Sequence, residues 1–185
     1  SAASDVYKRQ RYGSNFCKNS TELKYHEKLI IEEVEIFLAP AGHVLGSAQV
    51  VMNFANQVIT VSGDYKRQDD PTCAAFEPIK SDIFITEATF ALPVFKHPNA
   101  NTQINLLIKS IQNFPERCHV IGVYSLGKAQ RLIKMLRNNG WHNTIYLHGS
   151  LVKICNLYEK FGIDLGDLEP ATIQDKPEKL SLIHI

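Results

Sequence analysis

Alternating apolar positions in the first half of the chain predict β-strands. Every second residue from 34 to 38 is aliphatic, which predicts a strand that ends at the turn 39–42. Residues 48–54 and 57–61 are strand-like and flank an Ala-Asn pair, so they predict a hairpin. Residues 81–86 form a short apolar run of the buried-strand type. No helical pattern lies between these segments, and this half is therefore predicted to be a mainly antiparallel β layer.

The hydrophobic period changes near Pro93. Beyond it, apolar residues three and four positions apart predict three amphipathic helices, and short apolar runs predict a strand before the second and the third. The helices run through residues 104–111, 129–136 and 151–161, and the strands comprise residues 120–124 and 144–147. Thr102 is a candidate cap of the first helix, Ser125 starts the second, and Gly140 ends it. Strand and helix alternation at this spacing predicts a parallel α/β unit with right-handed crossovers.

The two ends of the chain match a laboratory adaptor. Residues 5–10 (DVYKRQ) match one translated strand of the transposon end used in sequencing libraries, and residues 180–185 (LSLIHI) match the translated complementary strand. We therefore expect residues 1–10 and 180–185 to be adaptor-derived and exclude them from fold reasoning. Residues 11–92 and 93–179 are then two expected domains of an α/β protein, and the chain is expected to be an internal piece of a longer one. No element is predicted beyond Gly166.

Composition and charge narrow the picture only a little. The formal net charge is +1, with 44% hydrophobic and 21% charged residues, as in an ordinary soluble globular protein. Such a charge gives no overall attraction to nucleic acid, so any binding of that kind must come from local patches. No apolar run approaches the length that crosses a bilayer. Four widely spaced cysteines without a CxxC pair predict reduced, structural thiols in a cytoplasmic protein.

Two residues after predicted strands carry the candidate chemistry. His43 follows the first strand, and Gly42 and Gly46 beside it permit a tight backbone path that holds a side chain at a sheet edge. Asp64 follows the second strand of the predicted hairpin. If these strands are adjacent in one layer, the two side chains lie near each other. A neutral imidazole binds zinc or a similar ion, and a carboxylate can bridge two ions in a hydrolytic site.

Five segments, in order, resemble motifs of the metallo-β-lactamase superfamily in its nucleic-acid-processing, β-CASP form. The third and fourth metal-binding motifs and motif A are matched by Pro40-Ala-Gly-His-Val-Leu-Gly-Ser-Ala-Gln49, Val61-Ser-Gly-Asp-Tyr-Lys66 and Ile85-Thr-Glu-Ala-Thr-Phe90. The strand-to-helix turn of the β-CASP insert is matched by Val123-Tyr-Ser-Leu-Gly-Lys-Ala-Gln-Arg-Leu132. Residues 69–78 add a likeness to bacterial exonucleases that are encoded beside an ATP-dependent DNA ligase and a helicase, a branch of the DNA cross-link repair nucleases.

This resemblance implies a fold, a metal site and a reaction. The fold is a partial metallo-β-lactamase αββα sandwich followed by part of a β-CASP α/β domain with parallel strands. The site holds two divalent ions, expected to be zinc, with His43 on one ion and Asp64 bridging both. Glu87 would orient a ligand or the attacking water. The reaction is hydrolysis of phosphodiester bonds in single-stranded or end-containing DNA, as an exonuclease in DNA repair, with a functional association with the ligase and helicase.

Three cations are expected to contact phosphates: Lys66, Lys128 and Arg131. Residues 125–128 open a helix after a strand, so free backbone N–H groups are expected to face an anion there. Three aromatic residues can stack on bases, although core packing is the expectation for each: Phe90, Phe95 and Tyr124. His148 is not assigned as a metal ligand.

Alternatives stay open because one signature of the family is missing. The chain has no His-x-His-x-Asp-His segment, which in the family supplies most metal ligands and the general base. The chain as given is therefore expected to be inactive, to hold metal weakly and to leave strand edges open. The alternatives are a β-CASP ribonuclease that processes RNA 3′ ends, a small-molecule hydrolase of the same superfamily, and a non-catalytic nucleic-acid-binding module.

Overall fold

The computed structural model describes residues 12–13, 21–171 and 181–184, and of the last four the backbone. It divides the chain into two compact units, Ser1–Pro93 and Val94–Ile185. Residues 1–10, which we expected to derive from an adaptor, lie outside the described residues, as do residues 180 and 185 at the other end. Among the described residues, no helix is both long enough and apolar enough to cross a membrane.

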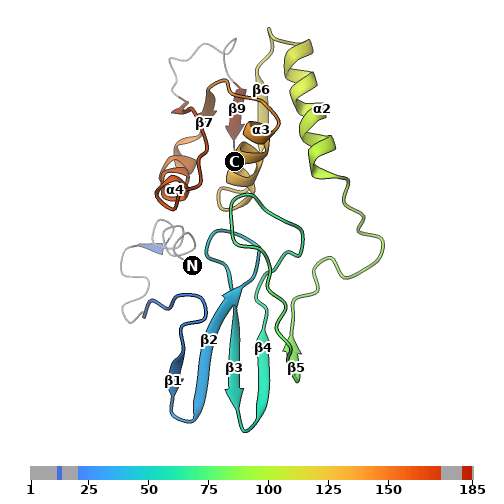
Figure 1. The fold of residues 1–185 in the computed structure, drawn as a ribbon. Coiled ribbons are helices and arrows are strands. Elements are labelled where there is room, and N and C mark those ends of the chain that lie inside the picture. The colour runs from blue at the N-terminus through green and yellow to red at the C-terminus, as the bar shows by residue number, and fades with distance from the viewer. Residues whose placement is uncertain (1–11, 14–20, 172–180, 185) are drawn as a thin grey trace. The chain divides into compact units, whose positions relative to one another are not determined.

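Five strands of the first unit form one sheet in chain order, which Figure 1 shows side by side. They are β1 (Leu29–Ile31), β2 (Val34–Pro40), β3 (Ala48–Phe54), β4 (Gln57–Val61) and β5 (Ile83–Ile85). β1 to β4 pair antiparallel, and β5 pairs parallel with β4. The predicted strands are therefore confirmed in type, while β1 is an element that the hydrophobic pattern did not reveal.

The hairpin of β3 and β4 has the geometry that its turn residues favour. Ala55 and Asn56 have φ of 50° and 61°, so both adopt the left-handed conformation that a two-residue hairpin turn requires. The register pairs Val50 with Val61 and continues to the turn without interruption. The predicted hairpin is confirmed, with both boundaries as expected.

The expectation that residues 81–86 form a buried strand is wrong. Three of them form β5, and Ile83, Phe84 and Ile85 are each about half exposed. The physical reason is position: β5 is the edge strand of the sheet, with β4 as its one neighbour among the described strands. Short apolar runs occur in edge strands as well as central ones, so the pattern alone does not decide burial.

The second unit contains parallel strands connected by helices. Its elements are α2 (Ala100–Asn113), β6 (His119–Gly122), α3 (Lys128–Asn138), β7 (Ile145–Leu147), α4 (Gly149–Lys160), β8 (Leu168–Pro170) and β9 (Ser181–His184). The sheet has the order β6-β9-β7-β8, and all three pairings are parallel. The predicted parallel α/β unit is confirmed. Both β8 and β9 lie beyond Gly166, where no element was predicted.

The helices bury the faces that their periodicity indicated. Ile104, Ile108 and Ile111 of α2 are buried, and so are most of the apolar residues of the stripes on α3 and α4, whereas Phe161, which follows α4, is 56% exposed. The buried side chains of these two helices include Ala129, Ile133, Leu136, Leu151, Ile154, Cys155 and Tyr158. Amphipathic stripes of this width are what a helix that packs on a sheet requires.

Two predicted helix starts differ from the structure. The cap of α2 is Asn99, whose side-chain oxygen accepts from Thr102 N at 3.1 Å, so Thr102 is the partner of the cap. Helix α3 begins at Lys128 after an N-cap at Gly127, three residues later than the predicted start at Ser125. Gly127 has φ 82°, a conformation that glycine adopts without strain and that ends the preceding turn. The predicted end of α3 at Gly140 is confirmed by the bond from Gly140 N to Arg137 O.

Candidate active site

The topology of the first unit brings three strand ends to one edge of the sheet. β2 and β4 are both antiparallel to β3, so they run in the same direction, and β5 runs parallel to β4. His43, Asp64 and Glu87 follow the carboxyl ends of β2, β4 and β5 within a few residues. The expectation that His43 and Asp64 follow adjacent strands is wrong, because β3 lies between them. Adjacent antiparallel strands end at opposite edges, and the intervening strand is what places both residues at the same edge.

The loop that carries His43 is closed by its own hydrogen bonds. Gly42 and Gly46 have φ of 69° and 71°, as their place beside His43 predicted. The Ser47 hydroxyl accepts from His43 N at 3.0 Å and from Val44 N at 3.1 Å. The loop is thus a compact turn, with the imidazole on its outer side.

A residue from outside the motif supports this loop. The Tyr25 hydroxyl donates to Ser47 O at 2.9 Å, and burial raises the pKa of Tyr25, so the phenol keeps the proton that it donates. Sequence analysis did not single out Tyr25. Its distance along the chain from Ser47 leaves no local signal that could have revealed the contact.

His43 and Asp64 form the central pair of the site. His43 Nε2 lies 3.7 Å from Asp64 Oδ2, and the two side chains are 42% and 75% exposed. The separation is too long for a hydrogen bond. Two ligands of one tetrahedral zinc ion lie about 3.3 Å apart when each bond is about 2.0–2.1 Å, so the pair fits a shared ion with little movement. An imidazole nitrogen and a carboxylate oxygen are also a donor set that zinc accepts.

Glu87 is the third member of the site. Its Oε2 accepts from Thr89 N at 2.7 Å. The hydrogen bonds from the Thr89 backbone and side chain, and then the nearby His43 imidazole, hold the pKa of Glu87 below its usual value. Glu87 is therefore a carboxylate at neutral pH. Thr89 was missed as a supporting residue, although a threonine two positions after an acidic residue is a recurrent local hydrogen-bonding pattern.

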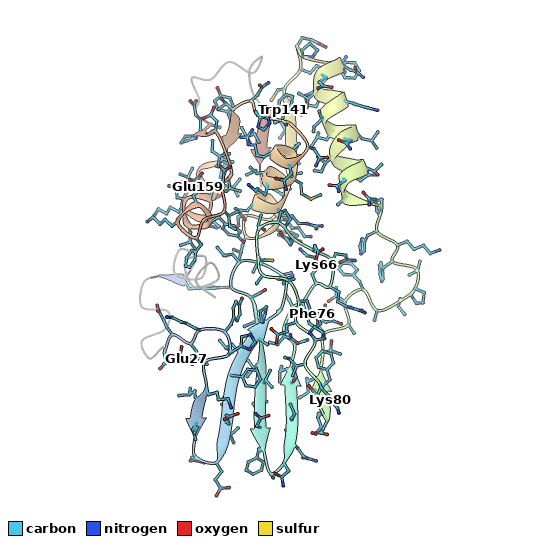
Figure 2. All side chains as sticks on the ribbon, in the orientation of Figure 1. Glu27, Lys66, Phe76, Lys80, Trp141 and Glu159 are labelled. Atoms are coloured by element: carbon cyan, nitrogen blue, oxygen red, sulfur yellow. The ribbon has the colours of Figure 1, made fainter. Side chains whose placement is uncertain are left out.

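Lys66, an expected phosphate contact, is already paired. Its ammonium contacts the Asp70 carboxylate, and the two side chains are only 17% and 4% exposed. Asp70 Oδ1 also accepts from Thr72 N at 2.9 Å and from the Thr72 hydroxyl at 2.6 Å. Figure 2 labels Lys66 and Phe76, which lie in the loops beyond the end of the sheet where β2 ends. A phosphate role for Lys66 stays a prediction, since a phosphate there would share the ammonium with Asp70.

The second unit holds the other two expected phosphate contacts. Lys128 is exposed, and its ammonium lies 4.6 Å from the centre of the Tyr124 ring. Arg131 is half-buried one turn further along α3. Tyr124 is 69% exposed, so the expectation that it packs in a core is wrong. The pair presents a positive charge and an aromatic face, and both are groups that contact nucleic acid in other proteins.

The expectation of free N–H groups at the start of α3 is wrong for the first three. Gly127 N donates to the Gln130 side chain at 2.8 Å, Lys128 N donates to Leu126 O, and Ala129 N donates to Tyr124 O. Gln130 is fully buried, and its side-chain oxygen accepts from the N-cap N–H as the corresponding residue of a capping box does. An anion at this helix start would therefore be held by side chains rather than by these N–H groups.

The other candidates lie as follows. Phe90 and Phe95 are exposed, so their expected core packing is wrong as well. His148 caps α4, with Nδ1 accepting from Ser150 N at 3.3 Å. Within the described ranges, no group of three or more histidine, cysteine or acidic side chains is arranged to hold a metal ion. Cys118 and Cys155, in the same ranges, are free thiols.

Comparison with known proteins shows that this chain is similar to β-CASP nucleases of the metallo-β-lactamase superfamily, and its fold is consistent with part of the fold of that class. No family model matches the chain. Cleavage and polyadenylation specificity factor 73 of Drosophila melanogaster is 33% identical over 142 residues, which are 72% of this chain and 21% of that protein. Endoribonuclease YSH1 of Gibberella zeae is 33% identical over 119 residues, 62% of this chain and 14% of that enzyme.

Two further comparisons cover more of the matched protein. An uncharacterized protein in the lig 3′ region of Acidianus ambivalens is 28% identical over 144 residues, 76% of this chain and 99% of that protein. A crystal structure of a protein of unknown function from Enterococcus faecalis V583 has a TM-score of 0.60 at 12% identity, covers 98% of this chain and 50% of its own, and shows likeness of fold. The chain spans about a fifth of the length of the first curated relatives that it matches. The resemblance and the fold class inferred from the sequence are both confirmed.

Proposed function

We propose that this chain is part of a metal-dependent exonuclease that hydrolyses phosphodiester bonds in DNA during repair. The observation that carries the proposal is the gathering of His43, Asp64 and Glu87 at one edge of the sheet. In this proposal residues 11–92 belong to the metallo-β-lactamase domain and residues 93–179 to the β-CASP domain. The 185-residue chain is inactive by itself, because two metal ligands are too few to hold a two-metal centre.

His43 and Asp64 supply the metal ligands that this chain contributes. His43 would bind one divalent ion through Nε2, and the Asp64 carboxylate would bridge two. Zinc is the metal that we propose, because nitrogen and carboxylate oxygen donors suit it. When bound, two such ions make a water molecule more acidic and neutralise the charge that develops on the phosphate.

Glu87 orients the attacking water in this proposal. Its lowered pKa keeps it ionised at neutral pH, so it accepts a hydrogen bond and does not deliver a proton as a general acid. The bond from Thr89 N at 2.7 Å fixes the orientation of the Glu87 carboxylate. The neighbouring His43 places this acceptor beside the metal ligands.

Phosphate contacts in the second unit would hold the strand. Lys128 is exposed beside Tyr124, and Arg131 lies on the next turn of the same helix, so both cations are placed where they could meet a phosphate backbone. Lys66 is kept in the proposal as a weaker contact because it also holds Asp70.

RNA is the second candidate substrate. Some of the comparisons favour DNA and others favour RNA. A relative whose name places it in a ligase region, matched over 99% of its length, favours DNA and a functional association with a ligase. The proposed association with a helicase rests on the resemblance of residues 69–78 alone. Endoribonuclease and polyadenylation-factor relatives at 33% identity favour RNA 3′-end processing. The longer protein should be given matched 5′-phosphorylated single strands of DNA and RNA. Loss of the DNA strand is expected, and loss of the RNA strand alone would reverse the assignment.

The bridging role of Asp64 gives a direct test. In the longer protein, Asp64→Asn should lower the nuclease rate by at least about a thousandfold, because the amide has no charge with which to bridge two ions. The thermal midpoint should change little, since Asp64 is exposed. Asp69→Asn, at another exposed aspartate of the same loop, is the matched control and should keep the wild-type rate. Retained activity in Asp64→Asn would mean that the chain is a non-catalytic binding module or uses other ligands.

A further inference from the structure

We propose that Gln49 and Asp70 are positioning residues that hold the His43 loop and the Asp64 loop against each other. The inference rests on the proposed function for its metal, but the geometry that it concerns belongs to the metal-free chain. Neither residue reaches the reacting atoms. Each side chain connects one of the two loops to residues 70–77. This segment lies within residues 69–78, whose sequence resembles that of the ligase-associated exonucleases.

Gln49 ties the His43 loop to this segment. It lies on β3, opposite the end of β2, and is fully buried. Its Nε2 donates to Pro40 O at 2.9 Å and to Glu77 O at 2.6 Å, and Glu77 N donates to the same Pro40 carbonyl at 3.1 Å. One amide group thus joins the residue where β2 ends to a segment that is distant along the chain. A buried polar side chain is retained at a cost, and here it makes two bonds that an apolar residue cannot make.

The His43 loop, the Asp64 loop and residues 70–77 are also in close backbone contact. Lys66 N donates to Ala41 O at 3.0 Å, which fixes the start of the His43 loop against the Asp64 loop. A Cβ built on Gly42 would lie 2.4 Å from Lys66 O and 2.8 Å from Phe76 N. The backbones at Gly42, Lys66 and Phe76 are therefore in direct contact, with no room for a side chain between them. His43 is the next residue, so its position depends on this contact.

Asp70 holds the other side of the junction. Its carboxylate accepts from the Lys66 ammonium and from both the N–H and the hydroxyl of Thr72. Thr72 is buried. Lys66 lies two residues after Asp64, so the Asp70 turn fixes the loop that carries Asp64. The rings of Tyr65 and Phe76 pack at 5.2 Å between centroids and close the same loop.

The two ties together set the separation of the ligand pair. His43 and Asp64 have no hydrogen bond to each other at 3.7 Å, and both are exposed, so their own contact does not hold them in place. Their spacing comes from the buried bonds behind them. Supporting residues of this kind commonly change metal affinity by about tenfold or more when they are replaced.

Hydrogen exchange on the metal-free chain tests the first tie. Gln49→Met keeps the side-chain length and removes both donors, so the amides of Lys66 and Glu77 should exchange about fivefold to tenfold faster. Gln57→Met, at the opposite end of the same sheet and exposed, is the matched control and should leave both rates unchanged. Unchanged exchange in Gln49→Met would overturn the role of Gln49, whatever the metal result.

Metal titration tests whether the ties act on the ligand pair. Mn²⁺ alone is added to the chain, and the broadening of the amide signals of Gly42 and Gly63 gives an apparent affinity. Thr72→Val, which removes one bond to Asp70 at constant size, should weaken this affinity about tenfold, and Thr72→Ser should restore it. Equal affinity in the wild type and Thr72→Val, together with weaker binding in Asp64→Asn, would overturn the proposal.

The outcomes separate this inference from the proposed function. If His43→Ala and Asp64→Asn weaken Mn²⁺ binding while Thr72→Val and Gln49→Met do not, the metal site stands and the positioning role fails. If no variant changes Mn²⁺ binding, the metal site fails, and the exchange rates alone decide whether Gln49 and Asp70 hold the two loops.

Discussion

Single residues at the strand ends are controlled by their immediate neighbours. The pKa of Glu87 is lowered because the N–H and the hydroxyl of Thr89 bond to its carboxylate, and because His43 lies nearby. Arg137 has the opposite environment, since burial lowers its pKa and four backbone carbonyls accept from its guanidinium. An arginine stays protonated in such a site, so the carbonyls take the place of a carboxylate partner. In both cases backbone groups form hydrogen bonds with the charged side chain.

Glu87 gives a prediction at this scale. Its pKa should lie below the ordinary value of 4.5, and Thr89→Val should raise it towards that value by removing the side-chain bond. A lowered pKa in the folded state stabilises the fold above the unfolded pKa, and this contribution is lost as pH falls through the folded pKa. Carbon-13 NMR titration of the Glu87 carboxyl measures the shift. Thr86→Val is the control, because the Thr86 hydroxyl donates to the Glu87 carbonyl and not to its carboxylate.

At the scale of elements, the site depends on where strands end and how loops meet. The carboxyl ends of β2, β4 and β5 lie at the same edge of the sheet. Buried hydrogen bonds from Gln49 connect the end of β2 to residues 70–77. At Gly42 the neighbouring backbone leaves no room for a side chain.

Gly42→Ala should therefore destabilise the first unit strongly. The positive φ costs about 1–2 kcal/mol for alanine, and overpacking against Lys66 O and Phe76 N adds about 1–3 kcal/mol. Gly63→Ala is the matched control, because Gly63 also has a positive φ but its Cβ would meet only Ala48 O at 3.7 Å. Urea unfolding monitored by the amide signals of β2 and β3 measures both. Equal losses in the two variants would mean that the contact at Gly42 is looser than the structure shows.

At the scale of the whole chain, two units with separate sheets share one polypeptide. The second sheet contains a strand from the far end of the chain, because β9 lies between β6 and β7. Figure 1 shows β9 between its neighbours. An inner strand satisfies backbone groups on both sides, so this short segment has more effect on its sheet than its length suggests.

Replacing residues 181–185 with a Gly-Ser segment of equal length should destabilise the second unit. The inner edges of β6 and β7 would lose their backbone partner, and glycine is a poor strand former. Amide exchange at Val120 and Tyr146 should become faster, and exchange in β2 and β3 should not change. A replacement rich in valine and threonine should restore slow exchange. Slow exchange with the Gly-Ser segment would show that β6 and β7 do not depend on β9.

The sequence could predict the elements whose causes are local. The turn at Ala55 and Asn56, the end of α3 at Gly140 and the buried faces of the helices follow from backbone preference and periodicity, which neighbours in the chain decide. Exposure was harder to predict. Tyr124 and the residues of β5 are exposed because they lie at a turn or at the edge of a sheet. The type of an apolar residue does not reveal whether it lies at such a position.

For the site, the sequence by itself determined which groups are candidates for the chemistry. His43 and Asp64 were identified by residue type, by flanking glycines and by their position after strands, and Glu87 by its place in a segment that resembles a family motif, all of which are local properties. Only the tertiary structure decided that three strand ends share one edge, that Lys66 is held by Asp70, and that Gln49 joins two distant loops. The physical reason is that strand direction and buried hydrogen bonds depend on partners far away in the chain, and these partners are chosen by the fold as a whole.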